Sequence, residues 1–125
     1  KISWGAENRD AMIRIPRYKP NKENSTRIEF RAPDSACNPY LAFAVTIAAG
    51  LKGVESGYEL GAEPSPKSLP ADLNEAILAM QESQLVRQCL GEHLFDYFLR
   101  NKRAEWLEYS KQVTAFEVDR YLPVL

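Results

Sequence analysis

The sequence predicts an α+β fold in which short strands come first and a helical half follows. Two observations support this prediction. Residues 1–34 contain short segments in which apolar and polar side chains alternate, separated by turn residues. From Pro39 onward the apolar residues recur at helical spacing. Because strands and helices are separated along the chain instead of alternating, an α+β arrangement is favoured over an α/β one.

The composition is that of an ordinary globular chain. It has 125 residues, of which 45% are hydrophobic and 26% are charged, enough for one domain with a core. Its net charge of −1 gives no general attraction for nucleic acid or an anionic membrane. No apolar run approaches the roughly 20 residues of a membrane span. We therefore expect neither partner, and any cationic site must be local.

The cysteines and the first residues predict a cytoplasmic protein. Cys37 and Cys89 form no CxxC pair, so a disulfide scaffold is not expected. The first ten residues lack the apolar core of a signal peptide. Residues 1–5, KISWG, look like a strand already under way, so we expect a piece of a longer protein.

The β region, residues 1–34, is expected to contain three strands. A short strand at residues 2–4 ends at a glycine, and a second strand lies at 11–16. Residues 27–31 alternate cleanly between charged and apolar side chains. The polar segment 17–26 between the last two strands contains Pro-Asn, which favours a turn. We therefore predict an antiparallel hairpin with a long tip.

A helix is predicted at residues 38–54. Asn38 is a good N-cap, and Pro39 suits the first helical position. Nearly every side of this helix is apolar or small, so we expect it to be buried on most faces. Residues 55–70 contain several Gly and Pro residues and are predicted to be a loop.

Helices are also predicted across residues 72–122. Asp72 can cap the first, with Glu75 at the third helical position, and Gly91 is expected to separate later helices. Beyond Gly91, aromatic residues recur at three or four positions, which predicts one helix of about thirty residues, far above the average length. Pro123 is expected to end it. Such a long helix should overhang its own core and need a neighbour.

The candidate functional residues lie on the predicted hairpin. Arg27, Glu29 and Arg31 would share one face of a strand. Arg9 precedes the other strand and Arg14 lies within it, so pairing would gather up to four arginines around one glutamate. A solvated ladder of ion pairs is the simple alternative. However, the strands use only arginine, the residue suited to bidentate contacts with phosphate and carboxylate.

A glutamate among arginines also suits a divalent metal. Mg²⁺ takes few protein carboxylates and shares its other positions with water and phosphate oxygens, so this residue set is typical of phosphoryl transfer. One carboxylate cannot complete a metal site, so further ligands must come from elsewhere. The P-loop and GxGxxG motifs are absent, and the single histidine, His93, is expected to be solvated or a helix cap.

Three motifs then resemble a known family. NRDAMIRIP, RIEFRAPD and NPYLAFAVTIAAGLKGV occur in that order, and together they resemble the C-terminal part of the catalytic domain of class I glutamine synthetase. The tail resembles the terminal helix of that family, and the resemblance covers essentially the whole chain. It implies an ATP-dependent ligase that joins glutamate and ammonia through γ-glutamyl phosphate, with Mg²⁺ or Mn²⁺.

The resemblance also implies roles for individual residues. Glu29 matches the glutamate that ligates the metal near the ATP phosphates. Arg31 matches the catalytic arginine that holds glutamate and the transferring phosphoryl group, and Arg9 matches one that contacts ATP phosphate and the glutamyl intermediate. Arg14 matches an arginine that binds ATP phosphate, and Arg27 resembles a further nucleotide-binding residue.

The sequence departs from the family pattern in four places, the smallest of which is RAPD in place of the commoner RFPD. Asp10 replaces the usual Ser or Thr, which puts a negative charge beside Arg9. Asn24 stands where a lysine is common, although Lys22 would serve if the loop were shifted. Tyr58 does not clearly match the tyrosine that is adenylylated in some bacterial members, so no regulatory site is carried over.

The resemblance further implies a homo-oligomer of stacked rings with active sites between adjacent subunits. The other metal ligands are absent from this sequence, so we expect the chain to be inactive in isolation. A related ligase that joins glutamate to another amine, such as a polyamine, is an open alternative. A non-catalytic relative that serves assembly or ligand sensing is another, although Glu29 and the arginines argue against it.

Overall fold

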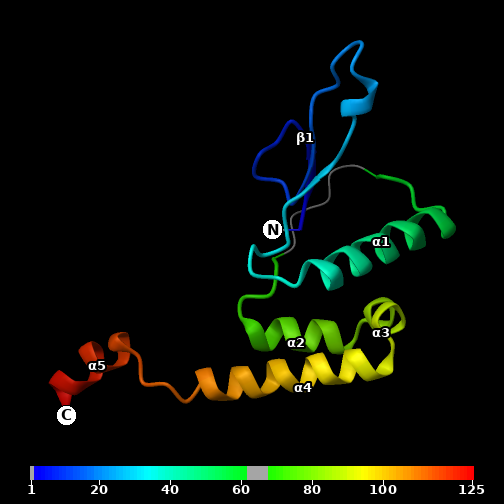
Figure 1. Cartoon of the computed structure of the whole chain (residues 1–125). Coiled ribbons are helices and arrows are strands. Elements are labelled where there is room, and N and C mark those ends of the chain that lie inside the picture. Colours follow the sequence, from blue (N-terminus) through cyan, green and yellow to red (C-terminus); the bar gives the residue numbers. More distant parts are fainter. Residues whose placement is uncertain (1, 62–67) are drawn as a thin grey trace. The chain divides into compact units, whose positions relative to one another are not determined.

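The computed structural model describes residues 2–61 and 68–125, and these form two compact units. The first unit is Lys1–Ala71, and the second is Asp72–Leu125. Among the described residues, the first contains a small three-stranded sheet, a short 3₁₀ helix and one α-helix, and the second contains the remaining helices (Figure 1). The α+β prediction is therefore confirmed. That both units belong to one domain of the longer protein stays a prediction.

The sheet has the order β1-β2-β3. Its strands are β1 (Trp4–Ala6), β2 (Ile13–Ile15) and β3 (Glu29–Phe30). β1 runs parallel to β2, whereas β2 and β3 are antiparallel. The predicted hairpin is confirmed, although β3 is shorter than the five-residue strand that was expected.

The register of the hairpin decides which side chains share a face. Arg14 lies opposite Glu29, and the backbone N–H of Arg31 donates to the carbonyl oxygen of Met12 at 2.8 Å. Because directly opposed residues point to the same side, these four residues lie on one face of the sheet. The long tip between the two strands contains a short 3₁₀ helix, Glu23–Ser25.

The predicted capping of the first helix, α1 (Pro39–Glu55), is confirmed. The Asn38 side chain accepts hydrogen bonds from the backbone N–H groups of Tyr40 and Leu41, at 3.0 and 3.4 Å. The prediction that this helix is buried on most faces is wrong for this chain, because none of its residues is buried. Five large apolar side chains of the helix are exposed: Tyr40, Phe43, Ile47, Leu51 and Val54.

The second unit contains a helical core. Helix α2 (Leu73–Gln81) lies along α4 (Glu92–Tyr109), and α3 (Gln84–Leu90) connects them (Figure 1). Their contact buries three side chains: Ile77, Phe95 and Leu99. Partly buried apolar residues pack around this core: Leu73, Met80, Val86, Leu90 and Trp106. Among the residues described, no helix is both long and apolar enough to span a membrane.

Gly91 separates α3 from α4, as the sequence predicted. Its φ of 74° and ψ of 154° belong to a region that essentially only glycine occupies. Its N–H donates to the carbonyl of Arg87, which closes α3, and its carbonyl accepts from Phe95, which opens α4. One residue therefore ends one helix and starts the next.

The prediction of a single helix of about thirty residues is wrong. Helix α4 ends at Tyr109, and a separate helix, α5 (Ala115–Tyr121), follows. Thr114 caps α5 because its hydroxyl oxygen accepts from the N–H of Glu117, while its own N–H donates to the Glu117 carboxylate at 2.7 Å. This capping box requires extended backbone at Thr114, so a continuous helix cannot run through this position. Pro123 lies in a final 3₁₀ turn, Leu122–Val124.

Candidate functional site

The paired strands β2 and β3 place a carboxylate between two guanidinium groups. Arg14 Nη1 donates to Glu29 Oε2 at 2.8 Å, and Arg27 Nη2 donates to Glu29 Oε1 at 3.2 Å. Arg14 reaches Glu29 because the two residues are opposed in the register, and Arg27 reaches it because it lies two positions earlier. Both carboxylate oxygens are therefore occupied by arginine.

This cluster is partly shielded from solvent. The Arg14 side chain is 22% exposed, and its Nε is buried without a hydrogen-bond partner among the described residues. The hydrogen bond from Arg14 is the main cause that lowers the pKa of Glu29 below its ordinary value. The positive charges of Arg14 and Arg27 lower it further. Glu29 is therefore ionised at neutral pH, which is the state that a metal ligand needs.

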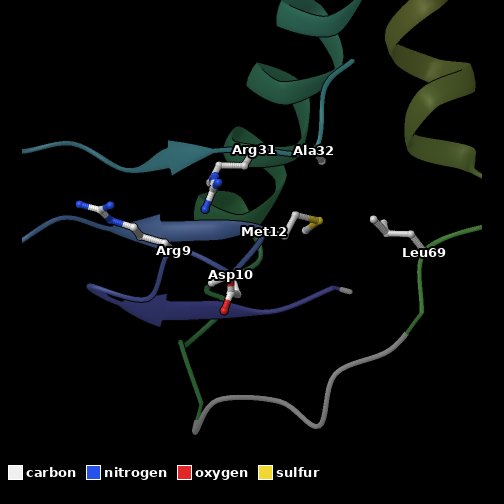
Figure 2. Close-up of a pocket in the computed structure, with 7 residues that line it drawn as sticks. Arg9, Asp10, Met12, Arg31, Ala32 and Leu69 are labelled. Atoms are coloured by element: carbon white, nitrogen blue, oxygen red, sulfur yellow. The ribbon is translucent and has the colours of Figure 1, made fainter. Parts of the chain in front are cut away.

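A pocket of about 370 Å³ lies in the same unit, and one of its lining residues, Arg31, follows Glu29 by two positions (Figure 2). Its charged lining is Arg9, Asp10 and Arg31, and its apolar lining is Ala11, Met12, Ala32 and Leu69. No side-chain ion pair or hydrogen bond of the three charged residues is found within the described structure. These charges are therefore available to a ligand.

The structure sorts the predicted site residues into two groups. Arg14, Arg27 and Glu29 form the ion-paired cluster, whereas Arg9 and Arg31 line the pocket. The hairpin face is therefore not one uniform arginine patch, and the ion ladder that was considered as an alternative is present on part of it. The roles assigned to these five residues from the family resemblance stay predictions.

Other residues of the region fall outside the site or were missed. Arg17, which follows β2, pairs with Glu7 at 3.7 Å, and both side chains are largely exposed. Leu69 lines the pocket but was not predicted, because nothing in its local sequence connects it to the strands. Met12 had a usable signal, since alternation places it on the same face as Arg14.

The described residues contain one part of a possible metal site. Glu29 offers carboxylate oxygens, the ligand type that Mg²⁺ prefers, and the neighbouring arginines suit the phosphate oxygens that share its coordination. No group of three or more His, Cys, Asp or Glu residues gathers within residues 2–61 and 68–125. His93 is exposed in the first turn of α4, and both cysteines are free thiols.

Comparisons with known proteins identify the kind of domain to which this site belongs. The family described as "Glutamine synthetase, catalytic domain" matches residues 1–121. The chain is therefore part of an enzyme's catalytic domain. It belongs to the glutamine synthetase family, and the resemblance found in its motifs is confirmed.

Individual relatives support the assignment to this family. The glutamine synthetase of Mycobacterium bovis is 50% identical over a region that covers 96% of this chain and 30% of that protein. The enzyme of Methanosarcina mazei is 45% identical, with coverage of 99% and 30%. The enzyme of Thermus thermophilus is 40% identical, with coverage of 97% and 30%. The chain thus spans about 30% of the length of the relatives that it matches.

Proposed function

We propose that the longer protein containing this chain is an ATP-dependent ligase that joins ammonia to glutamate through γ-glutamyl phosphate. The observation that supports this proposal best is the hairpin face, where Glu29 lies between two arginines. Two further arginines line the neighbouring pocket and form no ion pair among the described residues. Phosphoryl transfer depends on positioning and on neutralising charge, and these side chains can do both. In this proposal the chain supplies one wall of the active site.

The proposed roles follow from the position of each side chain. Glu29 would be one ligand of a Mg²⁺ or Mn²⁺ ion, which would neutralise charge on the phosphates of ATP. Arg14 and Arg27 would hold those phosphates, since guanidinium groups that bind a carboxylate also bind phosphate oxygens well. Arg9 and Arg31, which line the pocket, would hold glutamate and the phosphoryl group that is transferred.

We further propose that other parts of the longer protein complete this site and that the isolated chain is inactive. Glu29 alone cannot satisfy a metal ion, and the exposed apolar side chains of α1 favour burial against further protein. A homo-oligomer of stacked rings is the assembly that the family resemblance favours. Exposed apolar residues of α5, such as Phe116 and Tyr121, are suited to such contacts. The expected location is the cytoplasm.

A second candidate is a ligase that joins glutamate to a larger amine. The observation that favours it is Asp10, an anionic side chain in a pocket whose other charged residues are arginines. A non-catalytic role in assembly or ligand sensing is less favoured, since it does not account for the unpaired Arg9 and Arg31.

Replacing Glu29 tests the proposed function. In the full-length protein, Glu29→Ala should lower ATP- and glutamate-dependent phosphate release by at least about 100-fold, because it removes a metal ligand and leaves two arginines without their anion. Glu7→Ala is the matched control, since Glu7 lies in the same unit, its side chain is 60% exposed, and among the described residues its ion pair is with Arg17 at 3.7 Å. Turnover by Glu29→Ala equal to that of the control would refute the proposal.

A further inference from the structure

The pocket lined by Arg9, Asp10 and Arg31 contains one carboxylate to which the proposed function gives no role. The backbone N–H of Asp10 donates to Asn8 Oδ1 at 2.9 Å. Within the described structure, its side chain forms no hydrogen bond or ion pair. The local turn therefore does not depend on the carboxylate group, which is left to act on whatever enters the pocket.

The charges of this pocket differ from those of the ion-paired cluster. Glu29 accepts hydrogen bonds from two arginines, at 2.8 and 3.2 Å, so its charge is balanced by direct contact. Asp10 forms no such pair with Arg9 or Arg31 among the described residues. In Figure 2 the Arg9 side chain extends away from the Asp10 carboxylate. A ligand therefore meets two positive charges and one negative charge that do not neutralise one another by contact.

The size and the walls of the pocket let each charge act on a bound ligand. A sphere of 370 Å³ is about 9 Å across, which is within the Debye length of about 10 Å at 0.1 M salt. The rest of the lining is apolar, and Met12 and Leu69 point toward one another in Figure 2. Apolar walls screen charges less than water does. An anion held by the arginines is therefore repelled by Asp10.

This repulsion depends on the charge of the ligand. Coulomb energy is proportional to ligand charge, so Asp10 repels a dianion twice as strongly as a monoanion at the same position. Guanidinium groups bind phosphate dianions strongly, and the carboxylate offsets part of that attraction. A carboxylate ligand, with one negative charge, loses half as much binding free energy. The pocket therefore holds phosphate less tightly than two arginines alone would hold it.

We propose that Asp10 sets the charge selectivity of this pocket by weakening its affinity for dianionic phosphate, an inference that rests on the proposed function. The proposed reaction leaves inorganic phosphate at the arginines that held the transferred group. Product release limits the turnover of many enzymes. Asp10 promotes release of this dianion and changes less the affinity for the glutamate side chain, which has one negative charge. Asp10 is in this way a specificity-determining residue.

Two oxyanions of the same shape test the dependence on charge. Sulfate and perchlorate are both tetrahedral, and they have two negative charges and one negative charge. Calorimetric titration of the full-length protein at neutral pH and low salt measures their dissociation constants. Asp10→Asn should strengthen sulfate binding about tenfold and perchlorate binding about threefold, because the change in binding free energy scales with ligand charge. The factor for sulfate should thus be close to the square of the factor for perchlorate.

Three variants and a salt series separate charge from structure. Asp10→Ser should match Asp10→Asn, and Asp10→Glu, which keeps the charge, should stay within about twofold of the unmodified protein. Glu7→Gln removes an exposed carboxylate of the same unit, which pairs with Arg17 at 3.7 Å, and should also stay within about twofold. The effect of Asp10→Asn on sulfate should fall to about twofold between about 0.02 and about 0.5 M salt, because salt screens exposed charges.

Three results of the titrations would overturn the proposal. Equal factors for sulfate and perchlorate would mean that Asp10→Asn moves the arginines and does not act through charge. Weaker sulfate binding in Asp10→Asn would mean that the carboxylate holds the arginines in position. Sulfate binding that is unchanged by Asp10→Asn, or that is undetectable in both proteins, would mean that Asp10 does not control an anion site.

Product inhibition connects this charge effect to the proposed reaction. In the full-length protein, Asp10→Asn should lower the inhibition constant of inorganic phosphate about tenfold and the KM of glutamate about threefold or less. An unchanged inhibition constant in an active Asp10→Asn protein would overturn the proposal. A protein that consumes no ATP with glutamate and ammonia would contradict the proposed function instead, and the oxyanion titrations would still decide the role of Asp10.

Discussion

The two units differ in where their apolar side chains lie. The helical unit, Asp72–Leu125, buries Ile77, Phe95 and Leu99 against one another. In the described part of the strand-containing unit, Ala11 is the only buried apolar side chain, and α1 exposes its large apolar residues. The helical unit thus carries its own core. The unit with the candidate site leaves apolar side chains exposed to solvent and has charged side chains without an ion pair among the described residues. Both features are expected of a site that other parts of a larger protein complete.

The difference in burial arises because helices pack against helices in one unit, whereas short strands pair through a charged face in the other. Helices α2 and α4 lie side by side, so each turn adds apolar area to the same interface. The strands are only two or three residues long, and the face around Arg14 and Glu29 is charged, so little apolar area is removed from water there. Most of the stability of this chain should therefore reside in the helical unit.

The largest expected effect comes from emptying the helical core. Phe95→Ala should lower the free energy of unfolding by about 3–5 kcal/mol, because the ring is fully buried and packs under the Arg87 guanidinium at 4.2 Å. The measurement is urea unfolding of the 125-residue chain, followed by circular dichroism. Ile47→Ala in α1 is the matched control. Its side chain is 62% exposed, so the change should stay within about 0.5 kcal/mol. Equal losses in the two variants would contradict the contrast between the units.

A pair of glycine substitutions should give effects of opposite sign. Gly91→Ala should destabilise the helical unit by about 1–3 kcal/mol, because φ is 74° and ψ is 154° there. Gly50→Ala in α1 should stabilise that helix by about 0.5–1 kcal/mol, because an added Cβ meets no atom within 4 Å beyond the local helix backbone and alanine favours helix. Thermal unfolding of both variants measures the difference. Stabilisation by Gly91→Ala would show that this junction is not held as described.

The smallest effect should be confined to α5 and should depend on pH. The hydrogen bond from the Thr114 backbone N–H lowers the pKa of Glu117 in the folded chain. A group with a lowered folded pKa stabilises the fold above its unfolded pKa, about 4.3 for Glu, and loses that contribution as the pH falls through the folded pKa. Amide hydrogen exchange in α5 should therefore be slowest near pH 6, after correction for the intrinsic rate, and should lose protection below about pH 4.

Glu117→Gln provides the control for this dependence. Glutamine can still accept the hydrogen bonds of the capping box but does not titrate. Protection of α5 in this variant should be independent of pH between about 3 and 6. The same pH dependence in Glu117→Gln and in the unmodified chain would exclude the capping box as its cause.

Local features were predicted well from the sequence because each depends on neighbours within a few positions. Asn38 and Asp72 cap their helices, and Gly91 separates two helices, as expected. A local signal for the break before the last helix was also present in the sequence, because Thr114 and Glu117 have the spacing of a capping box. The aromatic periodicity was given more weight than this cap, and the continuous helix was therefore wrong.

The burial of α1 was not predictable in the same way. Its composition indicates only that the helix needs apolar contacts, and it cannot say which part of the protein provides them. The described residues do not provide those contacts, and no residue of the helix is buried. An apolar composition therefore does not establish that a helix is buried within the chain that contains it.

The sequence by itself determined the α+β class, the caps of α1 and α2, the family and the set of charged residues around the hairpin. Only the tertiary structure decided which of those charged side chains pair with one another. It pairs Glu29 with Arg14, fifteen positions away, and leaves Arg9, Asp10 and Arg31 in a pocket that Leu69 also lines. Local propensities act over a few residues, whereas these neighbours are brought together by strand register and chain folding. Which charge is satisfied and which is left for a ligand therefore follows from the fold.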